Sequence, residues 1–398
     1  MSKRVFITGI GHISAIGNNT AEARDHLKRG QSGIQKAKLL KSRYAEIFPF
    51  GEVPYNTSTL KERAGIADEK GISRTEVLAL LAFQQAIKDA ALSNEDIATY
   101  DTALLSASTV GGMSMTDQLY EDANKIGKPS EYLSSYNIGE HTNNLIKRFG
   151  LKGVSATFNT ACSSSANAIM FAAKLIKSGR CKRAIAGGTD ALSKFTVNGF
   201  NALQILSSEP CMPFDKNRSG LTLGEGAAYL VLESEEVVGN KKIYGEVSGY
   251  GNANDAFHPS SISEEAIGII ASISEALDVA NLQPGEIDYI NTHGTGTQNN
   301  DITEQTGMIK IFNNIPPFQS TKTYTGHTLA AAGAIEAVFS LLSMENNELY
   351  PSLNCKNPMD DYNAVPINDF ENNYEIKHVL SNSFGFGGNC SSLIFSKV

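Results

Sequence analysis

Cys162 is the residue of this chain best placed for covalent chemistry, because of what surrounds it. It lies in the segment Ala-Cys-Ser-Ser-Ser-Ala at 161–166, and an apolar pattern with a period near 3.6 residues predicts a helix over Ser164–Ser178. At a helix N-terminus, unpaired backbone N–H groups and the positive end of the helix dipole favour a thiolate, and serines suit that terminus. The setting predicts a nucleophile, although a lone cysteine is more commonly a buried structural residue. The other cysteines lack this setting and are expected to be inert: Cys181, Cys211, Cys355 and Cys390.

Two loops rich in small and hydroxyl residues carry histidines that could assist the cysteine. The first, Asn291–Thr297, presents His293 after an apolar strand-like run, where a ligand can approach closely. The second lies at 320–327 and holds Lys322 and His327 five residues apart, a pair able to stabilise developing negative charge. The competing interpretations are a histidine satisfied within a Gly/Thr turn, and a solvated lysine beside a helix-capping histidine.

A loop near the C-terminus, Asn382–Asn389, alternates glycine with phenylalanine. It suits a gate over an apolar tunnel or a backbone N–H donor for an oxyanion, and a tight turn beneath the core is the alternative. Zinc held by the cysteine and the two histidines is a less economical interpretation, because no motif supplies the carboxylate or histidine second shell of such a site. We therefore expect no metal.

Strand-like apolar runs alternate with helical patterns along all 398 residues, which is typical of an α/β fold. The predicted strands are Val5–Gly9, Thr102–Ser106, Arg183–Gly187, Ala227–Leu232, Tyr244–Gly251, Tyr289–Asn291, His378–Ser381 and Ser392–Phe395. The predicted helices, besides the one after Cys162, are Arg74–Ala91, Glu264–Val279, Thr303–Phe312 and Ala331–Met344. Each half carries a reactive segment that leads into a long apolar helix, which hints at a duplicated unit. No low-complexity tract or long linker interrupts the chain, so we expect one compact body.

Charge and cysteine content exclude several classes of protein. Lysine and arginine number 34 against 42 acidic residues, and the net charge of −8 argues against a general nucleic-acid binder. The five cysteines form no CxxC pair, which indicates neither a disulfide framework nor a cysteine-rich zinc site. The N-terminal segment predicts a first strand, Arg4–Gly9, entering a glycine turn, and not a signal peptide. No uninterrupted apolar run is long enough to cross a bilayer, so the expected location is a reducing cytoplasm.

Taken in order, these segments resemble the elongating β-ketoacyl-[acyl-carrier-protein] synthases, condensing enzymes of the thiolase-like superfamily, over nearly the whole chain. The matching segments are Arg4–Gly11, Thr160–Ser164, Met212–Arg218, Gly224–Ala227, Asn291–Thr297, Thr321–Gly333 and Asn382–Gly388. The resemblance implies a duplicated five-layer αβαβα fold, normally dimeric. An N-terminal half over 1–235 would carry the nucleophile, and a C-terminal half over 236–398 would carry both histidines and the glycine-phenylalanine loop.

The resemblance also implies how the motif residues would act. Cys162 would accept the acyl group, with the backbone N–H groups of Cys162 and Phe386 as the oxyanion hole. His293 and His327 would bind the malonyl thioester carbonyl, assist decarboxylation and stabilise the enolate. The implied reaction is a decarboxylative Claisen condensation with malonyl-[acyl-carrier-protein]. No cofactor would be bound, since the substrates are carried on the phosphopantetheine arm of the acyl carrier protein.

Further residues would support or line the site. Lys322 would act electrostatically on the two histidines, paired with Glu304, which lies one helical turn beyond Asp301. Phe386, helped by Phe384, would be the gate between acylation and condensation. Thr295 and Thr297 would bind the phosphopantetheine arm. Phe200 and Val110 would lie along the acyl tunnel, and Val110 would reach across from the partner subunit.

Alternative functions are weighed against the same residues. A non-catalytic chain-length partner subunit lacks the nucleophile, and Cys162 is present. A thiolase uses a second cysteine near its C-terminal glycine-rich loop, where Cys390 lies, but the two histidine loops are those of the condensing synthases. Starter enzymes that use acyl-CoA carry asparagine in place of the second histidine, and His327 speaks against that class.

Three departures from the family pattern bear on partners and pathway. Asn389-Cys390 stands where Thr-Asn is common, and Gly296 where serine is common. Thr75–Gln85 contains no lysine or arginine, although bacterial fatty-acid relatives place basic residues there to dock the acidic carrier. Weaker steering of the carrier is expected, so that either docking uses other lysines or a partner subunit supplies the surface. This favours a specialised polyene or polyketide pathway, as a heterodimer with a synthase-like partner, over a homodimer in fatty-acid synthesis.

Overall fold

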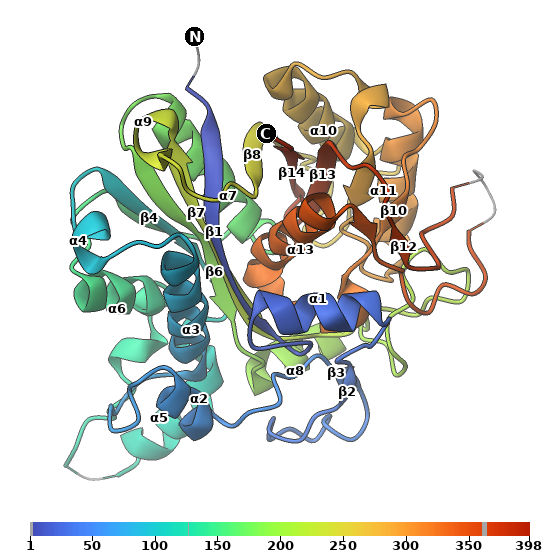
Figure 1. The fold of residues 1–398 in the computed structure, drawn as a ribbon. Coiled ribbons are helices and arrows are strands. Elements are labelled where there is room, and N and C mark those ends of the chain that lie inside the picture. The colour runs from blue at the N-terminus through green and yellow to red at the C-terminus, as the bar shows by residue number, and fades with distance from the viewer. Residues whose placement is uncertain (1–2, 126, 360–363) are drawn as a thin grey trace.

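A ten-stranded mixed sheet runs through the protein in the computed structural model, which describes residues 3–125, 127–359 and 364–398 (Figure 1). Its strands lie in the order β10-β9-β13-β14-β8-β1-β7-β6-β4-β5. The first five in sequence are β1 (Val5–Ser14), β4 (Thr102–Ala107), β5 (Ser155–Phe158), β6 (Arg183–Asp190) and β7 (Gly226–Ser234). The other five are β8 (Gly245–Asn254), β9 (Tyr289–Asn291), β10 (Phe318–Gln319), β13 (His378–Phe384) and β14 (Asn389–Ser396).

The two halves of this sheet share one topology. In each half the first strand in sequence pairs antiparallel with the fifth, and the fifth antiparallel with the fourth. The fourth then pairs parallel with the second, and the second parallel with the third. A short antiparallel pairing of β1 with β8, with Phe6 opposite Glu246 and Ile7 opposite Gly245, joins the halves. The duplication that the sequence hinted at is therefore present in the strand order.

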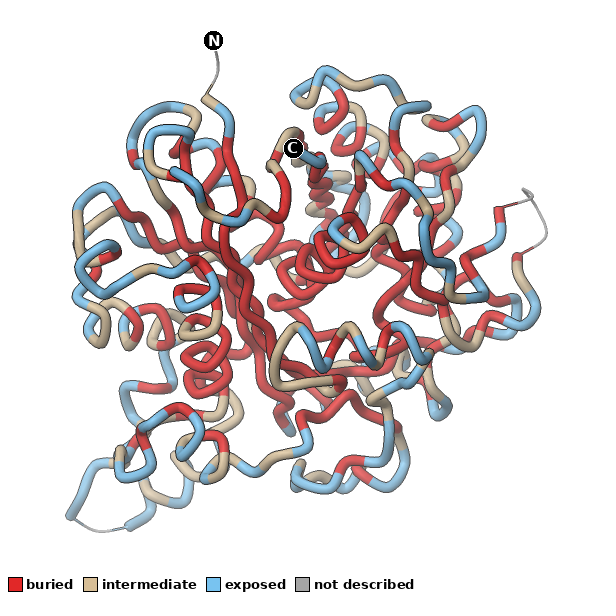
Figure 2. The backbone as a smooth tube through the Cα atoms, viewed as in Figure 1, coloured by how far each residue is buried: buried red, intermediate tan, exposed pale blue. Residues whose placement is uncertain are grey.

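Helices complete a five-layer αβαβα arrangement (Figure 1). The five longest helices described are α3 (Arg74–Asp89), α7 (Ser164–Lys177), α10 (Ile267–Ala280), α11 (Gln298–Ile311) and α13 (Ala332–Asn346). Helix α3 covers β1 and β7 on one outer face, and α10 covers β8 and β14 on the other. Helices α7 and α13 lie between the two halves and contact strands of both, and α13 is buried from Ala332 to Met344 in the red centre of the molecule (Figure 2). The predicted fold class is confirmed.

Shorter elements connect this framework. The remaining helices are α1 (Thr20–Lys28), α2 (Thr57–Arg63), α4 (Asn94–Ile97), α5 (Thr116–Ala123), α6 (Glu140–Phe149), α8 (Lys194–Ala202), α9 (Glu235–Val238) and α12 (Lys322–Thr325). The remaining strands are β2 (Gln35–Lys36), β3 (Pro49–Phe50), β11 (Glu348–Leu349) and β12 (Glu371–Asn372). Within the described ranges, no helix has the length and apolar character needed to span a membrane.

The first strand is longer than predicted. The sequence predicts a strand that stops at Gly9 in a turn, whereas β1 continues through Gly9 and Gly11 to Ser14. The reason is packing against α3: a Cβ added at Gly9 would lie 2.4 Å from the carbonyl oxygen of Ala86, and one added at Gly11 would lie 2.0 Å from that of Ala82. These glycines therefore admit the helix close to the strand and do not form a turn.

Most of helix α3 is part of the core. Every residue of Val77–Phe83 is buried, in an apolar cluster with β1, β6 and β7. Its lack of lysine and arginine follows from that burial, because charged side chains are rarely buried without a partner. The absence of basic residues in Thr75–Gln85 therefore reflects burial, and weaker steering of the carrier stays a prediction.

Candidate active site

Cys162 lies in a tight turn between β5 and α7. Ala161, immediately before it, has a left-handed backbone with φ +54°, a costly conformation that persists only where the surroundings impose it. The Ser163 hydroxyl donates to the carbonyl oxygen of Thr160 at 2.8 Å, and the Ser164 hydroxyl accepts from the Thr160 N–H at 2.9 Å. The turn is thereby fixed by its own serines, and Cys162 is only 7% exposed.

Burial makes Cys162 a thiol at rest. Desolvation raises its pKa to about 11, although the backbone N–H of Phe386, the charge of Lys322 and its own backbone N–H favour the thiolate. The prediction of a thiolate at a helix N-terminus was wrong. Helix α7 begins two residues later, at Ser164, and the loss of hydration outweighs the helix terminus.

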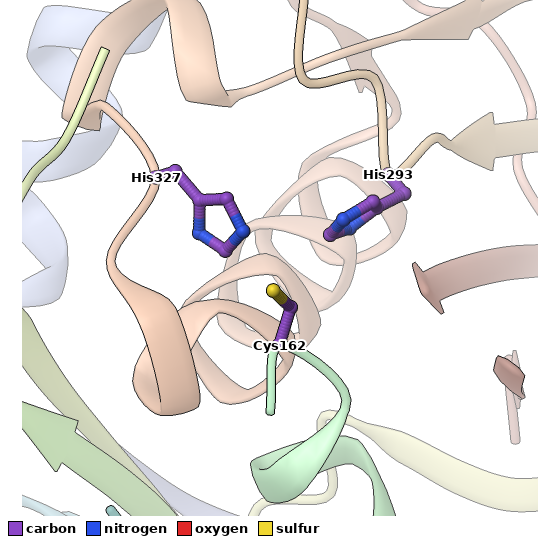
Figure 3. A group of neighbouring side chains, drawn as sticks. All are labelled: Cys162, His293 and His327. Atoms are coloured by element: carbon purple, nitrogen blue, oxygen red, sulfur yellow. The ribbon is translucent and has the colours of Figure 1, made fainter. Parts of the chain in front are cut away.

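The fold brings both predicted histidines to Cys162 (Figure 3). His293 comes from the loop after β9, and His327 from the turn that follows α12. One ring nitrogen of each histidine and the sulfur of Cys162 all lie within 4.8 Å of one another, and all three residues are buried. The imidazole centroids are 5.4 Å apart with an angle of 86° between the rings. Three segments distant in sequence therefore converge on one point.

Hydrogen bonds on the far side of each imidazole fix its tautomer. Nδ1 of His327 accepts from the backbone N–H of Leu329 at 3.0 Å. Nδ1 of His293 lies 3.2 Å from Nζ of Lys322, and an ammonium can only donate. Burial and the charge of Lys322 lower the pKa of both histidines well below the ordinary value, so both rings are neutral at pH 7. Each neutral ring must then carry its proton on Nε2, which makes it a hydrogen-bond donor toward the cavity.

The same tautomers bear on metal binding. Cysteine and two histidines are the residue types that hold zinc, and these three are close enough to do so. A histidine that ligates metal through Nε2 normally donates its other N–H to an acceptor. Here Nδ1 of His293 and of His327 each faces a donor, so the pair is arranged to donate hydrogen bonds and not to share lone pairs with a cation.

Lys322 forms its ion pair with Glu336. The predicted pairing with Glu304 was wrong. Its ammonium contacts the Glu336 carboxylate and donates to the carbonyl oxygen of His293 at 2.6 Å. Both partners of this ion pair are 2% exposed. Burial raises the pKa of Glu336 to about 7, against the pull of the adjacent ammonium. Glu336 went unnoticed in the sequence, although one carboxylate within the otherwise apolar run Ala332–Met344 was a detectable signal.

Glu304 shapes the first histidine loop instead. Its two carboxylate oxygens accept from the backbone N–H groups of His293 and Gly294, both at 2.8 Å. The side chain of Asn382 donates to it at 3.2 Å. Burial raises the pKa of Glu304 to about 7, and these donors oppose that rise. Glu304 therefore sets the backbone of the loop, while Lys322 acts on the imidazole.

Two cavities meet at Cys162. The first, of about 290 Å³, is lined by His293, His327, Thr295 and Thr297 among others. The second, of about 470 Å³, has mostly apolar walls that include Val110, Phe195, Phe200, Leu203 and Leu329. Cys162, Phe200, Leu203 and Phe386 border both cavities. The Phe386 ring stacks on Phe200 with centroids 5.9 Å apart, and the Phe384 ring lies 5.8 Å from His293.

Val110 lines the apolar cavity from the same chain as Cys162, which corrects the expectation that it reaches across from a partner subunit. A buried carboxylate holds it there. Asp190 accepts from the Val110 N–H at 2.9 Å and from the Ser108 hydroxyl at 2.6 Å. It also accepts from the N–H of Ala330 at 2.8 Å, which ties the cavity wall to the turn after His327.

The two single-residue departures have local explanations. The side-chain oxygen of Asn389 accepts from Ser163 at 2.7 Å and Asn167 at 2.9 Å, so it joins the glycine-phenylalanine loop to the nucleophile turn. Gly296 has φ +81°, and a Cβ there would lie 2.9 Å from the carbonyl oxygen of Gly220. A serine at 296 would be strained in this loop.

Comparisons with known proteins agree with this geometry. The chain matches the families described as "Beta-ketoacyl synthase, N-terminal domain" over residues 2–237 and "Beta-ketoacyl synthase, C-terminal domain" over residues 244–356. The 3-oxoacyl-[acyl-carrier-protein] synthase 2 of Staphylococcus aureus strain N315 is 30% identical over 414 residues, covering 100% of this chain and 99% of that protein.

Two solved structures extend the comparison. The ishigamide ketosynthase/chain length factor has a TM-score of 0.92 at 29% identity, with 100% of both chains covered. AntDE:AntF, described as a type II PKS acyl-carrier protein in complex with its ketosynthase bound to the hexaketide, has a TM-score of 0.89 at 26% identity, also with full coverage of both chains. The site holds a buried thiol beside two imidazole donors, and the matches extend over the whole length of the chain. The chain therefore belongs to the β-ketoacyl synthase family.

Proposed function

We propose that this protein condenses an acyl group held on Cys162 with malonyl-[acyl-carrier-protein], with loss of CO2, to give a β-ketoacyl-[acyl-carrier-protein]. The observation that carries the proposal is the position of Cys162, with an apolar cavity on one side and two Nε2–H donors on the other. A covalent thioester divides a bimolecular carbon–carbon bond formation into two steps.

In the first step, the sulfur of Cys162 attacks the incoming thioester carbonyl. The bond from that carbonyl to the carrier's sulfur breaks, and the departing carrier thiol takes up the proton that Cys162 loses. The backbone N–H groups of Cys162 and Phe386 are proposed to hold the tetrahedral oxyanion. The acyl chain then occupies the apolar cavity, along Val110 and Phe200.

In the second step, the malonyl carboxylate leaves as CO2, and the electron pair of the broken bond moves onto the thioester oxygen as an enolate. His293 and His327 donate to that oxygen through Nε2–H, so neutral imidazoles suffice. The nucleophilic carbon then attacks the acyl carbonyl on Cys162. The bond from that carbonyl to sulfur breaks, and the released thiolate takes up one proton from water.

The other predicted residues have proposed roles around this reaction. Lys322 supports the histidine pair, with Glu336 as its counter-charge and Glu304 as the support of the loop. Phe386 acts as the gate between the two cavities, together with Phe384. The residues proposed to contact the phosphopantetheine arm are Thr295 and Thr297, whose hydroxyl groups lie 2.9 Å apart in the first cavity.

We further propose that the protein functions as a dimer in the cytoplasm. Within each chain, residues 1–235 and 236–398 form the N-terminal and C-terminal halves. The outer edge of β5 lies at the end of the sheet, and Val154 and Phe171 beside it are 47% and 37% exposed. An apolar surface along an unpaired strand edge suits a second chain. The partner can be identical or a synthase-like chain. One solved relative is a ketosynthase/chain length factor and the other is a type II PKS carrier protein in complex with its ketosynthase, which supports a specialised pathway.

The experiment is a reconstituted reaction followed by intact-protein mass spectrometry. Acyl-[acyl-carrier-protein] should leave an acyl adduct on Cys162, and subsequent malonyl-[acyl-carrier-protein] should discharge it as β-ketoacyl product. The Cys162→Ala variant should form neither, while Cys390→Ala should form both. An adduct on Cys390, or product from Cys162→Ala, would contradict the proposal and favour a thiolase-like reaction.

A further inference from the structure

A group of exposed cations lies on the connection between α1 and α2. Lys36, Lys38, Lys41 and Arg43, here called the basic patch, are all exposed, and none forms an ion pair with a carboxylate in the described part of the chain. Residues 36–47 hold these four cations and a single carboxylate, Glu46, which leaves a local charge of +3 in a chain of net charge −8. So strong a local departure from the overall charge calls for a function.

The segment that carries the basic patch is rigidly built. Glu52, only 5% exposed, accepts from three consecutive backbone N–H groups, those of residues 38, 39 and 40, at 2.7, 2.9 and 2.7 Å. Ala37 and Ala45 are buried beneath it. Arg43 is held over the ring of Tyr44, 4.7 Å from its centroid. The charges are thus presented on a fixed backbone, which lowers the entropy lost when a partner binds.

The basic patch adjoins the entrance to the active site. The Tyr44 hydroxyl accepts from the side chain of Asn201 on α8 at 2.9 Å. Leu40 and Tyr44 pack against the apolar cluster that also holds Phe200. Phe200 and the neighbouring Leu203 line both cavities, and Leu203 is 52% exposed. The segment that carries the patch therefore contacts α8, the helix whose Phe200 lines both cavities, and the exposed Leu203 at its end marks the entrance as we use the word.

Three other parts of the described structure, the first cavity, α3 and residues 61–70, offer no comparable charge. The residues that line the first cavity include no aspartate, glutamate, lysine or arginine among those the structure describes. Most of helix α3 is buried. Residues 61–70 hold three cations, Lys61, Arg63 and Lys70, against three carboxylates at 62, 68 and 69. An acidic macromolecule that delivers a substrate to Cys162 would meet a local excess of positive charge at the basic patch, close to Phe200 and Leu203.

We propose that the basic patch is the docking surface for the acidic face of the acyl carrier protein. This inference rests on the proposed function, which requires both substrates to arrive on such a carrier. Exposed apolar side chains within the same segment, Leu39 at 38% and Ile47 at 51%, supply contact area between the cations. Charge complementarity there would speed carrier encounter and would weaken as salt is added.

The test is the charge-reversal variant Lys38→Glu/Lys41→Glu/Arg43→Glu. With malonyl-[acyl-carrier-protein] as the varied substrate, kcat/KM at low salt should fall about tenfold or more, and the difference should shrink at about 0.5 M salt, where exposed charges are screened. With malonyl-pantetheine, which has no protein surface, kcat/KM should match that of the unaltered protein. Binding of holo-acyl carrier protein to Cys162→Ala, measured by calorimetry with and without the three reversals, reports docking without turnover.

A matched control reverses three exposed lysines, Lys242, Lys377 and Lys397, which lie just outside the ends of β8, β13 and β14. The C-terminus, which follows β14, lies at the opposite end of the molecule from β2 and β3 (Figure 1). The control should leave both substrates unaffected. The proposal would be overturned if kcat/KM fell equally in the control variant, or if it fell equally with malonyl-pantetheine. Unchanged carrier binding in the patch variant would overturn it as well. A change of oligomeric state in the patch variant would assign the surface to contacts between copies and would also overturn it. Absence of product from the unaltered protein with either substrate, while carrier binding still depends on the patch, would refute the proposed reaction and leave the docking surface supported.

Discussion

Replacing Glu336 by glutamine tests the buried ion pair that supports the histidines. Glu336→Gln preserves the size of the side chain and removes the counter-charge of Lys322, which is 2% exposed. Breaking a buried pair by removing one partner costs about 3–5 kcal/mol, because the other charge stays buried and unpaired. At about 2.1 cal/mol/K per residue, 398 residues give an unfolding entropy of about 0.8 kcal/mol/K, so Tm should fall by about 4–6 °C.

The same change should affect catalysis selectively. Without its counter-charge, the Lys322 side chain is no longer held in place, and Nδ1 of His293 then has no fixed donor. His293 can adopt the other tautomer, and the cavity loses one N–H donor to the enolate. Loss of one such donor typically costs about 10²–10³ in kcat. Acyl transfer to Cys162 does not use that donor and should change far less.

A double-mutant cycle with Lys322→Met provides the assay. Thermal and denaturant unfolding of Glu336→Gln, Lys322→Met and the double variant should give a coupling energy of about 1–3 kcal/mol. The parallel cycle with Glu304→Gln is the control, because Glu304 accepts from backbone N–H groups and makes no ion pair with Lys322. A larger coupling with Glu304 than with Glu336, or a Glu336→Gln variant as stable as the unaltered protein, would refute this account of Lys322.

Three further changes follow from the geometry. Burial raises the pKa of Cys162 to about 11, so the rate at which iodoacetamide alkylates it should rise about tenfold per pH unit from 7 to 10. Mass spectrometry would follow the alkylation, and a plateau below pH 8 would restore the thiolate prediction. Val110→Phe should fill the apolar cavity and lower kcat/KM for long acyl chains while sparing short ones in a chain-length series; equal losses for all lengths would place the acyl chain elsewhere. Gly296→Ser should lower the unfolding free energy by about 1–3 kcal/mol, because φ is +81° and its Cβ would crowd Gly220; unchanged denaturant stability would contradict that strain.

Much of the fold and the identity of the reactive residues were readable from local sequence. Strand and helix positions follow from periods of 2 and 3.6 residues, and the helix after Cys162 was predicted over Ser164–Ser178 and is observed over Ser164–Lys177. Helix α11 begins at Gln298, five residues before its predicted start, because its first turn is polar and shows no apolar period. Cys162, His293 and His327 were identified by the small and hydroxyl residues around them, which are also local features.

Tertiary structure decided everything that depends on contacts between distant segments. The family resemblance implied Glu304 as the partner of Lys322, whereas α13 places Glu336 against it. The tautomers of the two histidines depend on Lys322 and on the backbone of Leu329, and the resting thiol of Cys162 depends on burial by loops from both halves. The sequence by itself determined which groups are present and which local elements carry them. Their protonation, pairing and direction were decided by the tertiary structure, because desolvation and hydrogen bonding between remote segments arise only when the chain is packed.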